Sequence, residues 1–411
     1  MIMKKFAFLL IGLLITVSFG YSQNSKVVSA YNYHNNGKLD KAKENIDAAT
    51  ANPKTASNAK TWYYRGNIYI DIYRTQDSAY MNLDPEALPK AYEAYTKAME
   101  LDTKKQYMVD ILTYMPIVGE SYFNQGARKY NDGMNALNAK DSVKSRAEFG
   151  ESVNSFEMAY KIYEDLGRVD TTTIYYVSIA AELGEDYEKA IINLEKLIEM
   201  GYPEPSIYSS AANIYYTHLY DTVNAAATYM AGREKYPHDL NLLLNETNFF
   251  LAEDETDKAL NNLTLAAKID ETNPTIFFAI GAKYNEVVDD STSTTEMKES
   301  AFMEAANAYK KSIEINPDYF DPNYNMGALY VNKAASLIEI ANELPFDKQA
   351  EYDTLRNQAD TYLKECLPYL EKAQELQPED RSTLISLKEI YTRLRMDDKR
   401  AAIDAKLKEE N

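Results

Sequence analysis

The chain has 411 residues, of which 63 are acidic and 44 are basic, giving a net charge of −19. This acidic balance argues against nucleic acid as a partner and against attachment to anionic lipid, because both need a basic surface. With 14 Gly and 13 Pro, about half the usual combined share of roughly 12%, the sequence has few residues for tight turns and favours helices over many short strands.

The first 22 residues have the form of a secretory signal peptide. Lys4 and Lys5 precede an apolar run over residues 6–17, and small residues follow up to Ser22. The run is shorter than the ~20 apolar residues of a transmembrane helix, and no Cys follows it to carry a lipid anchor. We therefore expect residues 1–22 to be removed. The mature chain would be exported, either to the periplasm of a Gram-negative bacterium or out of the cell, and would not span a membrane.

Residues 174–203 show a pattern that recurs along the rest of the chain. A stretch of apolar, small and aromatic residues is followed by a short turn, by the spacing A-x-x-x-L-x-x-L, and by a proline. Ala190, Ala225 and Ala259 repeat this spacing 35 and 34 residues apart. Small residues let two helices cross closely, large residues fill the space around the crossing, and proline ends the second helix.

The pattern can be placed eight times in chain order. The units are marked by Ala30, Tyr33, Gly37, Ala42, Ile46 and Ala49; Trp62, Gly66, Tyr69, Ala91, Tyr95 and Ala98; Met115, Gly119, Tyr122, Ser152, Phe156 and Ala159; Ile174, Ser178, Ala181, Ala190, Leu194 and Leu197; Tyr208, Ala212, Tyr215, Ala225, Tyr229 and Pro237; Leu243, Thr247, Phe250, Ala259, Leu263 and Ala266; Phe277, Gly281, Tyr284, Ala305, Tyr309, Ser312 and Pro317; and Gly327, Tyr330, Cys366, Leu370, Ala373 and Pro378. A final helix pair contains Leu384, Leu387 and Tyr391.

These units resemble the tetratricopeptide repeat. The resemblance implies an all-α fold, a right-handed superhelical solenoid of stacked antiparallel helix pairs. It would cover residues 23–411 as about eight repeats and a C-terminal capping helix pair. Four turns are longer than the repeat requires, at residues 73–89, 128–146, 287–297 and 339–360. The composition of the second and fourth insertions favours longer helix pairs, whereas residues 289–295 (DDSTSTT) are typical of a loop.

The sequence offers no recognisable catalytic or metal-binding motif. His34, His218 and His238 are not spaced as metal ligands, and there is no Gly-rich phosphate loop or G-x-S-x-G motif. Cys366, the only cysteine, lies in a helical pattern and is expected to be buried. We predict a protein without catalysis, cofactor or metal.

The resemblance implies that a partner binds along the concave face, which the first helix of each repeat lines. Asparagine recurs there, and an amide can both donate to and accept from a peptide backbone. Aromatic side chains lie between these amides and suit apolar peptide anchors or the faces of sugars. Alternatively, the same residues form an ordinary exposed helix face. The predicted partner-binding residues are Tyr63, Asn67, Tyr175, Asn213, Tyr216, Asn248, Phe278 and Tyr324.

We therefore predict a scaffold that binds a partner protein or an extended peptide and serves assembly or maintenance of the cell envelope. The alternative is a glycan- or peptidoglycan-binding protein on the same scaffold.

Six triplets read Asp, then Ser or Thr, then a residue with a methyl group. They resemble the O-glycosylation sequon of some Gram-negative bacteria, with candidate hydroxyls on Ser78, Ser142, Thr171, Thr222, Ser291 and Thr354. Asp-Ser and Asp-Thr are also common helix-capping and turn pairs, so the pattern alone favours neither interpretation.

Overall fold

The computed structural model describes residues 25–409, and every regular element in this part of the chain is a helix. The described residues form two compact units, divided after Ala225. The all-α fold predicted from the sequence is confirmed. The predicted signal peptide, residues 1–22, lies outside the described residues.

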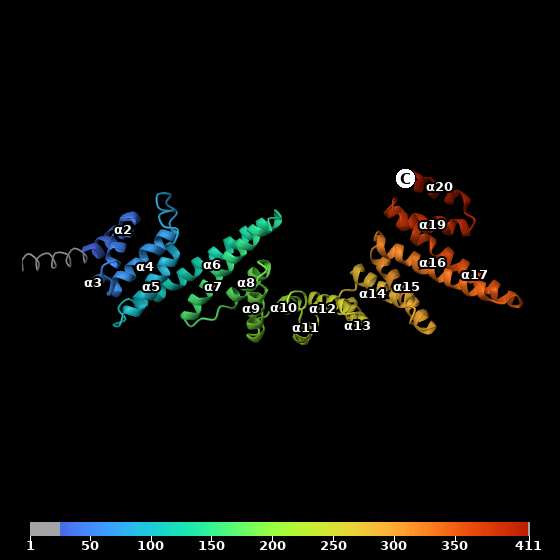
Figure 1. Cartoon of the computed structure of the whole chain (residues 1–411), viewed down its shortest axis with the longest axis horizontal. Helices are drawn as coiled ribbons and strands as arrows, with labels where there is room; N and C mark the ends of the chain where they lie inside the picture. Colours follow the sequence, from blue (N-terminus) through green and yellow to red (C-terminus); the bar gives the residue numbers. More distant parts are fainter. Residues whose placement is uncertain (1–24, 410–411) are drawn as a thin grey trace, which may run out of the picture. The chain divides into compact units, whose positions relative to one another are not determined.

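In the first unit, successive helices pack as antiparallel pairs. Helix α4 packs on α5, α6 on α7 and α8 on α9, and neighbouring pairs meet through α5 and α6, α7 and α8, and α9 and α10 (Figure 1). A helix over residues 25–35 opens the described chain. The others are α2 (Leu39–Thr50), α3 (Pro53–Ala56), α4 (Ala59–Arg74), α5 (Ala87–Leu101), α6 (Met108–Asn138), α7 (Ser142–Asp165), α8 (Thr171–Leu183), α9 (Tyr187–Glu199), α10 (Ser206–Thr217) and the start of α11 (Thr222–Lys235).

The second unit continues in the same way after α11. Helix α12 packs on α13, α14 on α15, α16 on both α17 and α18, and α19 on α20. The second helix of the α16 pair is divided at Cys366, because Pro368 cannot donate a helical hydrogen bond. The bounds are α12 (Leu240–Ala252), α13 (Thr256–Ile269), α14 (Pro274–Asp289), α15 (Thr295–Ile315), α16 (Phe320–Glu343), η1 (Phe346–Lys348), α17 (Gln349–Glu365), α18 (Leu367–Leu376), α19 (Arg381–Arg393) and α20 (Asp397–Glu409).

Polar capping residues explain where many first helices begin. An Asn or Asp side chain accepts a hydrogen bond from a backbone N–H two or three residues further on, which satisfies a donor that the helix leaves unpaired. Such caps precede five first helices: Asn58 before α4, Asp170 before α8, Asp239 before α12, Asn273 before α14 and Asp380 before α19.

The turns between the two helices of a pair contain little glycine, although they require left-handed backbone conformations. Gly37 takes a left-handed conformation in the first pair, with φ of 70°. In later pairs the same conformation falls on residues with side chains, at a cost of roughly 1 kcal/mol each. These are Lys140, Glu185, Tyr220, Asp254 and Arg395, with φ between 54° and 63°.

Glycine faces an aromatic ring or Leu370 where the helices of a pair cross. A Cβ added to Gly66 would lie 2.5 Å from the ring of Tyr95, and one on Gly281 would lie 2.6 Å from Tyr309. Leu370 covers Gly327 in the same way. These contacts join the small and large positions of the repeat pattern, so here the structure confirms the register expected from the sequence.

The α6–α7 pair uses this contact three times. Tyr163 faces Gly119, Phe156 faces Gly126 and Phe149 faces Gly133, so both sets recur every seven residues along antiparallel helices. The sequence register, which paired Phe156 with Gly119, was wrong by seven residues. A single-repeat motif cannot reveal this shift, because the extension repeats the same small-to-large spacing.

The other insertions follow the expectations from composition. Residues 128–146 extend α6 and α7, and residues 339–360 extend α16 and α17 around the short helix η1. Residues 290–294 form the turns and bends of a loop between α14 and α15. Cys366 is fully buried as expected, and burial raises the pKa of its thiol to about 12.

Candidate functional site

All eight predicted partner-binding residues lie on the first helices of their pairs. In the first unit they are Tyr63 and Asn67 on α4, Tyr175 on α8, and Asn213 and Tyr216 on α10; in the second unit they are Asn248 on α12, Phe278 on α14 and Tyr324 on α16. Asn213 and Asn248 are exposed, whereas the other six side chains are half-buried.

The half-buried aromatic residues are held by other rings. The ring centroids of Tyr175 and Tyr202 are 5.4 Å apart, and those of Phe278 and Tyr319 are 5.5 Å apart. In both cases the second ring precedes the next first helix along the chain. Tyr324 stacks on Phe320 within α16, at 5.9 Å. These aromatic side chains therefore fix the turn that leads into the next pair. They also line the side formed by the first helices of the pairs, which we call the first-helix side; the opposite side is the second-helix side.

Around α4 the rings form a continuous set, which we call the tyrosine row: Tyr31, Tyr64, Tyr63 and Tyr107. The successive centroid distances are 4.8 Å from Tyr31 to Tyr64, 5.6 Å from Tyr64 to Tyr63, and 5.0 Å from Tyr63 to Tyr107. The row thus joins the helix over residues 25–35, helix α4 and the start of α6. Tyr31 is 41% exposed and the other three rings are half-buried.

Hydrogen bonds orient the middle of the tyrosine row. The Tyr95 hydroxyl donates to Oδ1 of Asn67 at 2.8 Å, and the Tyr63 hydroxyl donates to Asp110 at 3.2 Å. Burial raises the pKa of Tyr63, while a hydrogen bond from the Asn67 side chain opposes that shift. The Asn67 amide is therefore tied to Tyr95 through its oxygen, and its contact with a partner stays a prediction.

The border of the tyrosine row mixes charge with exposed apolar surface. Lys60 lies 5.4 Å from the Tyr64 ring centroid, and Asp71 is paired with His34 at 2.7 Å. At the start of α6, Val109 is 75% exposed and Leu112 is 46% exposed.

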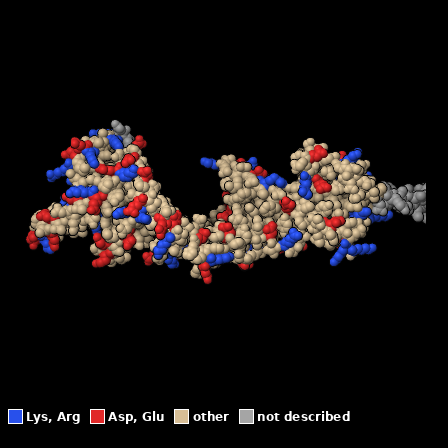
Figure 2. All heavy atoms as spheres, turned by 180° about the vertical axis from the view of Figure 1, so that it is seen from behind, with Lys and Arg blue, Asp and Glu red and all other residues tan. Residues whose placement is uncertain are grey.

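Acidic and basic side chains are interspersed on the face of the molecule in Figure 2, which shows no large basic area of the kind that phosphate backbones require.

The sequence pattern identified Tyr63 and missed Tyr31, Tyr64 and Tyr107. Tyr31 and Tyr64 meet across two helix pairs, so their contact depends on how the pairs stack. Tyr107 lies in the turn before α6, and the repeat spacing does not predict the conformation of this turn. The recurrence of tyrosine near these helix starts was the only signal in the sequence that could have indicated them.

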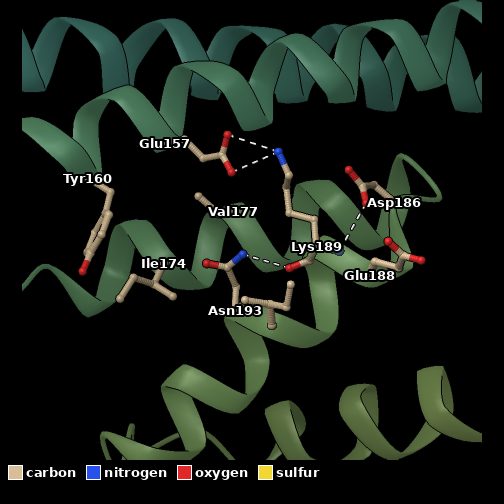
Figure 3. A pocket seen from close by; sticks show the side chains of 9 residues that line it. Glu157, Tyr160, Ile174, Val177, Asp186, Glu188, Lys189 and Asn193 are labelled. Carbon is tan, nitrogen blue, oxygen red and sulfur yellow. Dashed lines mark hydrogen bonds and ion pairs between the residues drawn. The ribbon is translucent and has the colours of Figure 1, made fainter.

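A separate hollow of about 560 Å³ opens between α7 and α9, over α8 (Figure 3). Glu157 of α7 and Lys189 of α9 pair across it at 3.0 Å, and Ile174 and Val177 of α8 supply apolar lining. The Ile192 side chain, which also lines the hollow, is 62% exposed. None of the eight predicted residues lines this hollow, which lies on the second-helix side.

Catalytic and metal-binding groups are sparse among residues 25–409. In this range no cluster of His, Cys, Asp and Glu side chains suits a metal ion. His34 pairs with Asp71, and the ring of His218 stacks on Tyr187 at 3.5 Å. Over the same range, no helix combines the length and apolar character needed to cross a membrane.

The six candidate glycosylation hydroxyls lie in two kinds of place. Ser142, Thr171 and Thr222 are the first residues of α7, α8 and α11, and Ser78 and Ser291 lie in turns. Asp side chains cap these helices or close these turns, as Asp141 does by accepting from the N–H of Lys144. Capping and turn formation therefore account for the position of the Asp in five of the six triplets, and modification of the hydroxyls stays a prediction. Thr354 differs, because it lies within α17 and donates to the carbonyl of Ala350.

Successive helix pairs, closed by small residues facing large ones, define an α-helical repeat protein. The TPR repeat family model matches residues 296–333, which cover α15 and the start of α16. Residues 296–333 therefore contain a tetratricopeptide repeat, and the described chain has a TPR-like all-α fold; proteins with this repeat bind protein or peptide partners.

Several solved structures are similar to this chain at low identity. A C-terminal part of a TPR repeat-containing protein from Cytophaga hutchinsonii is 14% identical over 63% of this chain and 88% of its own, with a TM-score of 0.42. The MamA protein is 16% identical over 50% of this chain and 95% of its own, with a TM-score of 0.34. YrrB, described as a TPR protein with an unusual peptide-binding site, is 16% identical over 56% and 97%, with a TM-score of 0.34. No curated protein sequence matches the chain.

Proposed function

We propose that this protein is an exported, non-catalytic scaffold that binds a partner protein or an extended peptide of the cell envelope on its first-helix side. The observation that carries the proposal is the tyrosine row with its border of exposed apolar residues. Val109 and Leu112 are exposed on the first turns of α6, within five residues of Tyr107, and Tyr31 is exposed at the other end of the row. Exposed apolar surface bordered by polar groups is typical of protein-binding sites.

The arrangement of the row favours a protein over a sugar. Three of its four rings are half-buried, and the rings stack on one another, so each face used in stacking is unavailable to a pyranose. Ring edges, tyrosine hydroxyls and neighbouring aliphatic side chains remain accessible for contact. Such groups suit the side chains of a bound peptide. The Asp110 carboxylate, which accepts from the Tyr63 hydroxyl, could also accept from a peptide N–H group.

The experiment is affinity purification of tagged protein from the native cell envelope, with identification of everything retained at near-stoichiometric level. We expect V109S and Y31S to lose the partner. V223S is the matched control, because Val223 is 76% exposed at the start of α11 and lies outside the row. Purification of the protein alone, or equal retention by V109S and V223S, would refute the proposal. Binding of glycan or peptidoglycan fragments without any protein would favour the alternative function.

Export rests on the sequence of residues 1–22, and it has its own test. Protein isolated from the native host should begin at or near residue 23 and fractionate with the periplasm or the medium. An intact N-terminus in the cytoplasm would contradict export.

Modification of the six Asp-Ser and Asp-Thr hydroxyls is a second part of the proposal. Ser78, Ser142, Thr222, Ser291 and Thr354 are exposed, so a modifying enzyme could reach them. The intact mass of protein from the native host decides this point. A mass equal to that of the unmodified mature chain would remove the idea.

A further inference from the structure

The turn between α16 and α17 carries a fully exposed phenylalanine. Phe346 begins the short helix η1, and its exposure is 106% of the reference value for the residue. Leu344 and Pro345 lead into it in extended backbone conformations. Glu343 and Asp347 are exposed on either side, and neither makes an ion pair within the described residues. We call residues 343–348 the tip.

The tip extends beyond the packed part of its hairpin. Ala341 of α16 and Ala359 of α17 are buried, whereas no residue from 342 to 358 is buried. Ordering this segment costs conformational entropy that core packing within it does not offset. Contiguous apolar surface on a monomer marks interaction sites, and at the tip Phe346 lies directly after Leu344 and the exposed Pro345.

The second unit also contains a hollow of about 500 Å³ between α13, α14 and α15. Apolar side chains of Phe277, Ile280 and Tyr284 on α14 line it, together with Ala267 on α13 and Ala308 on α15. This volume falls in the usual range of about 300–1,000 Å³ for binding pockets. We call it the α14 hollow.

Charged side chains surround the α14 hollow. Lys268 of α13 and Lys311 of α15 line it and make no ion pair within the described residues. Glu271 and Glu304 lie at the same rim, and burial followed by the charge of Glu304 raises the pKa of Tyr284. The rim therefore carries two basic and two acidic groups, and its two lysines are the groups that can meet carboxylates on an incoming surface.

We propose that the tip of one copy of this chain inserts Phe346 into the α14 hollow of a second copy. The apolar ring would fill the apolar hollow, and Glu343 and Asp347 would face Lys268 and Lys311. Within one copy the α16–α17 turn lies away from α13 and α14, so a chain cannot fill its own hollow (Figure 1).

The contact joins two different surfaces, so each bound copy still offers one tip and one hollow. Such a heterologous contact adds copies in a row unless the geometry closes a ring. The inference therefore concerns self-assembly and is independent of the partner proposed for the first-helix side.

Sedimentation velocity of the full chain over a wide range of concentration tests the proposal. We expect the average mass of the wild type to rise with concentration. F346S and A267E, which alter the tip and the hollow respectively, should each weaken association by at least about tenfold, as for a central aromatic anchor. V143S is the matched control, because Val143 is 80% exposed at the start of α7, next to the turn of the other long hairpin. It should assemble as the wild type does.

Mixing the two defective variants gives the sharpest result. F346S keeps an intact hollow and A267E keeps an intact tip, so the mixture should form dimers and nothing larger. Circular dichroism establishes that both variants remain folded. A wild type that stays monomeric throughout, an F346S variant that assembles normally, or a mixture that remains monomeric would each overturn the proposal.

Discussion

The repeated glycine–aromatic contact of the α6–α7 pair leads to a quantitative prediction for Gly126. A Cβ built on Gly126 would lie 2.8 Å from the Phe156 ring, which is buried at 1% exposure. The ring cannot move away freely, because Phe123 packs against it at 5.2 Å and Tyr176 at 5.5 Å between centroids. Gly126→Ala should therefore force the two helices apart or push the ring from its preferred position.

Gly150 provides the matched control within the same helix pair. It lies in α7, it is exposed, and a Cβ added there would meet no atom within 4 Å. Both substitutions gain up to about 1 kcal/mol from the higher helix propensity of alanine. Overpacking at Gly126 costs about 1–3 kcal/mol, so G150A should stabilise the protein while G126A leaves it unchanged or destabilises it. The difference between the variants should be about 1–3 kcal/mol.

Urea unfolding followed by circular dichroism measures this difference. Adding F156L to G126A should recover part of the loss, because leucine gives the new methyl group more room, whereas adding it to G150A should only destabilise. Equal stability of G126A and G150A would show that the close approach of α6 and α7 is not as described.

Three further predictions concern other parts of the chain. Cys366 should resist alkylation in the native protein and react only after unfolding, because burial raises the pKa of its thiol to about 12; rapid native labelling would contradict its burial. Tyr220→Gly should stabilise the protein by about 1 kcal/mol, because a φ of 54° at this exposed position is less favourable for a residue with a side chain than for glycine; a lower melting temperature would refute this. Burial opposes ionisation of Asp84, yet bonds from Lys90 and from the N–H of Glu86 outweigh it and lower the pKa. A lowered folded-state pKa contributes stability above the pKa of the unfolded chain and loses it as pH falls through the folded value. D84N should therefore melt at a lower temperature at neutral pH and lose less stability on acidification, and an unchanged pH profile would argue against the ion pair.

The repeat spacing was enough to predict the helix pairs, because close helix crossings require small residues at fixed intervals. Gly66 with Tyr95 and Gly281 with Tyr309 meet as that spacing implies. It failed for Phe156, because the α6–α7 extension adds seven-residue steps that preserve the local pattern. Register along a long helix pair is decided by all its contacts together, which no single repeat contains.

The candidate site was less accessible from the sequence than the fold. Position within a helix indicated that Tyr63 lies on the first-helix side, but not that the Tyr95 hydroxyl would donate to the Asn67 amide oxygen. The stacking of Tyr31 on Tyr64 depends on the packing of separate helix pairs, and the exposure of Phe346 depends on how far a hairpin extends. These properties arise from tertiary packing and have no counterpart in local spacing.

The most direct test of the central claim is site-specific photocrosslinking in the native host. A photoreactive residue replaces Tyr64 in the tyrosine row, and in a matched variant it replaces Ile192 on the second-helix side. The account predicts a discrete protein adduct from position 64 that disappears when V109S is added, and none of the same mass from position 192. An adduct from position 192 alone, or no protein adduct from position 64, would contradict a binding site on the tyrosine row.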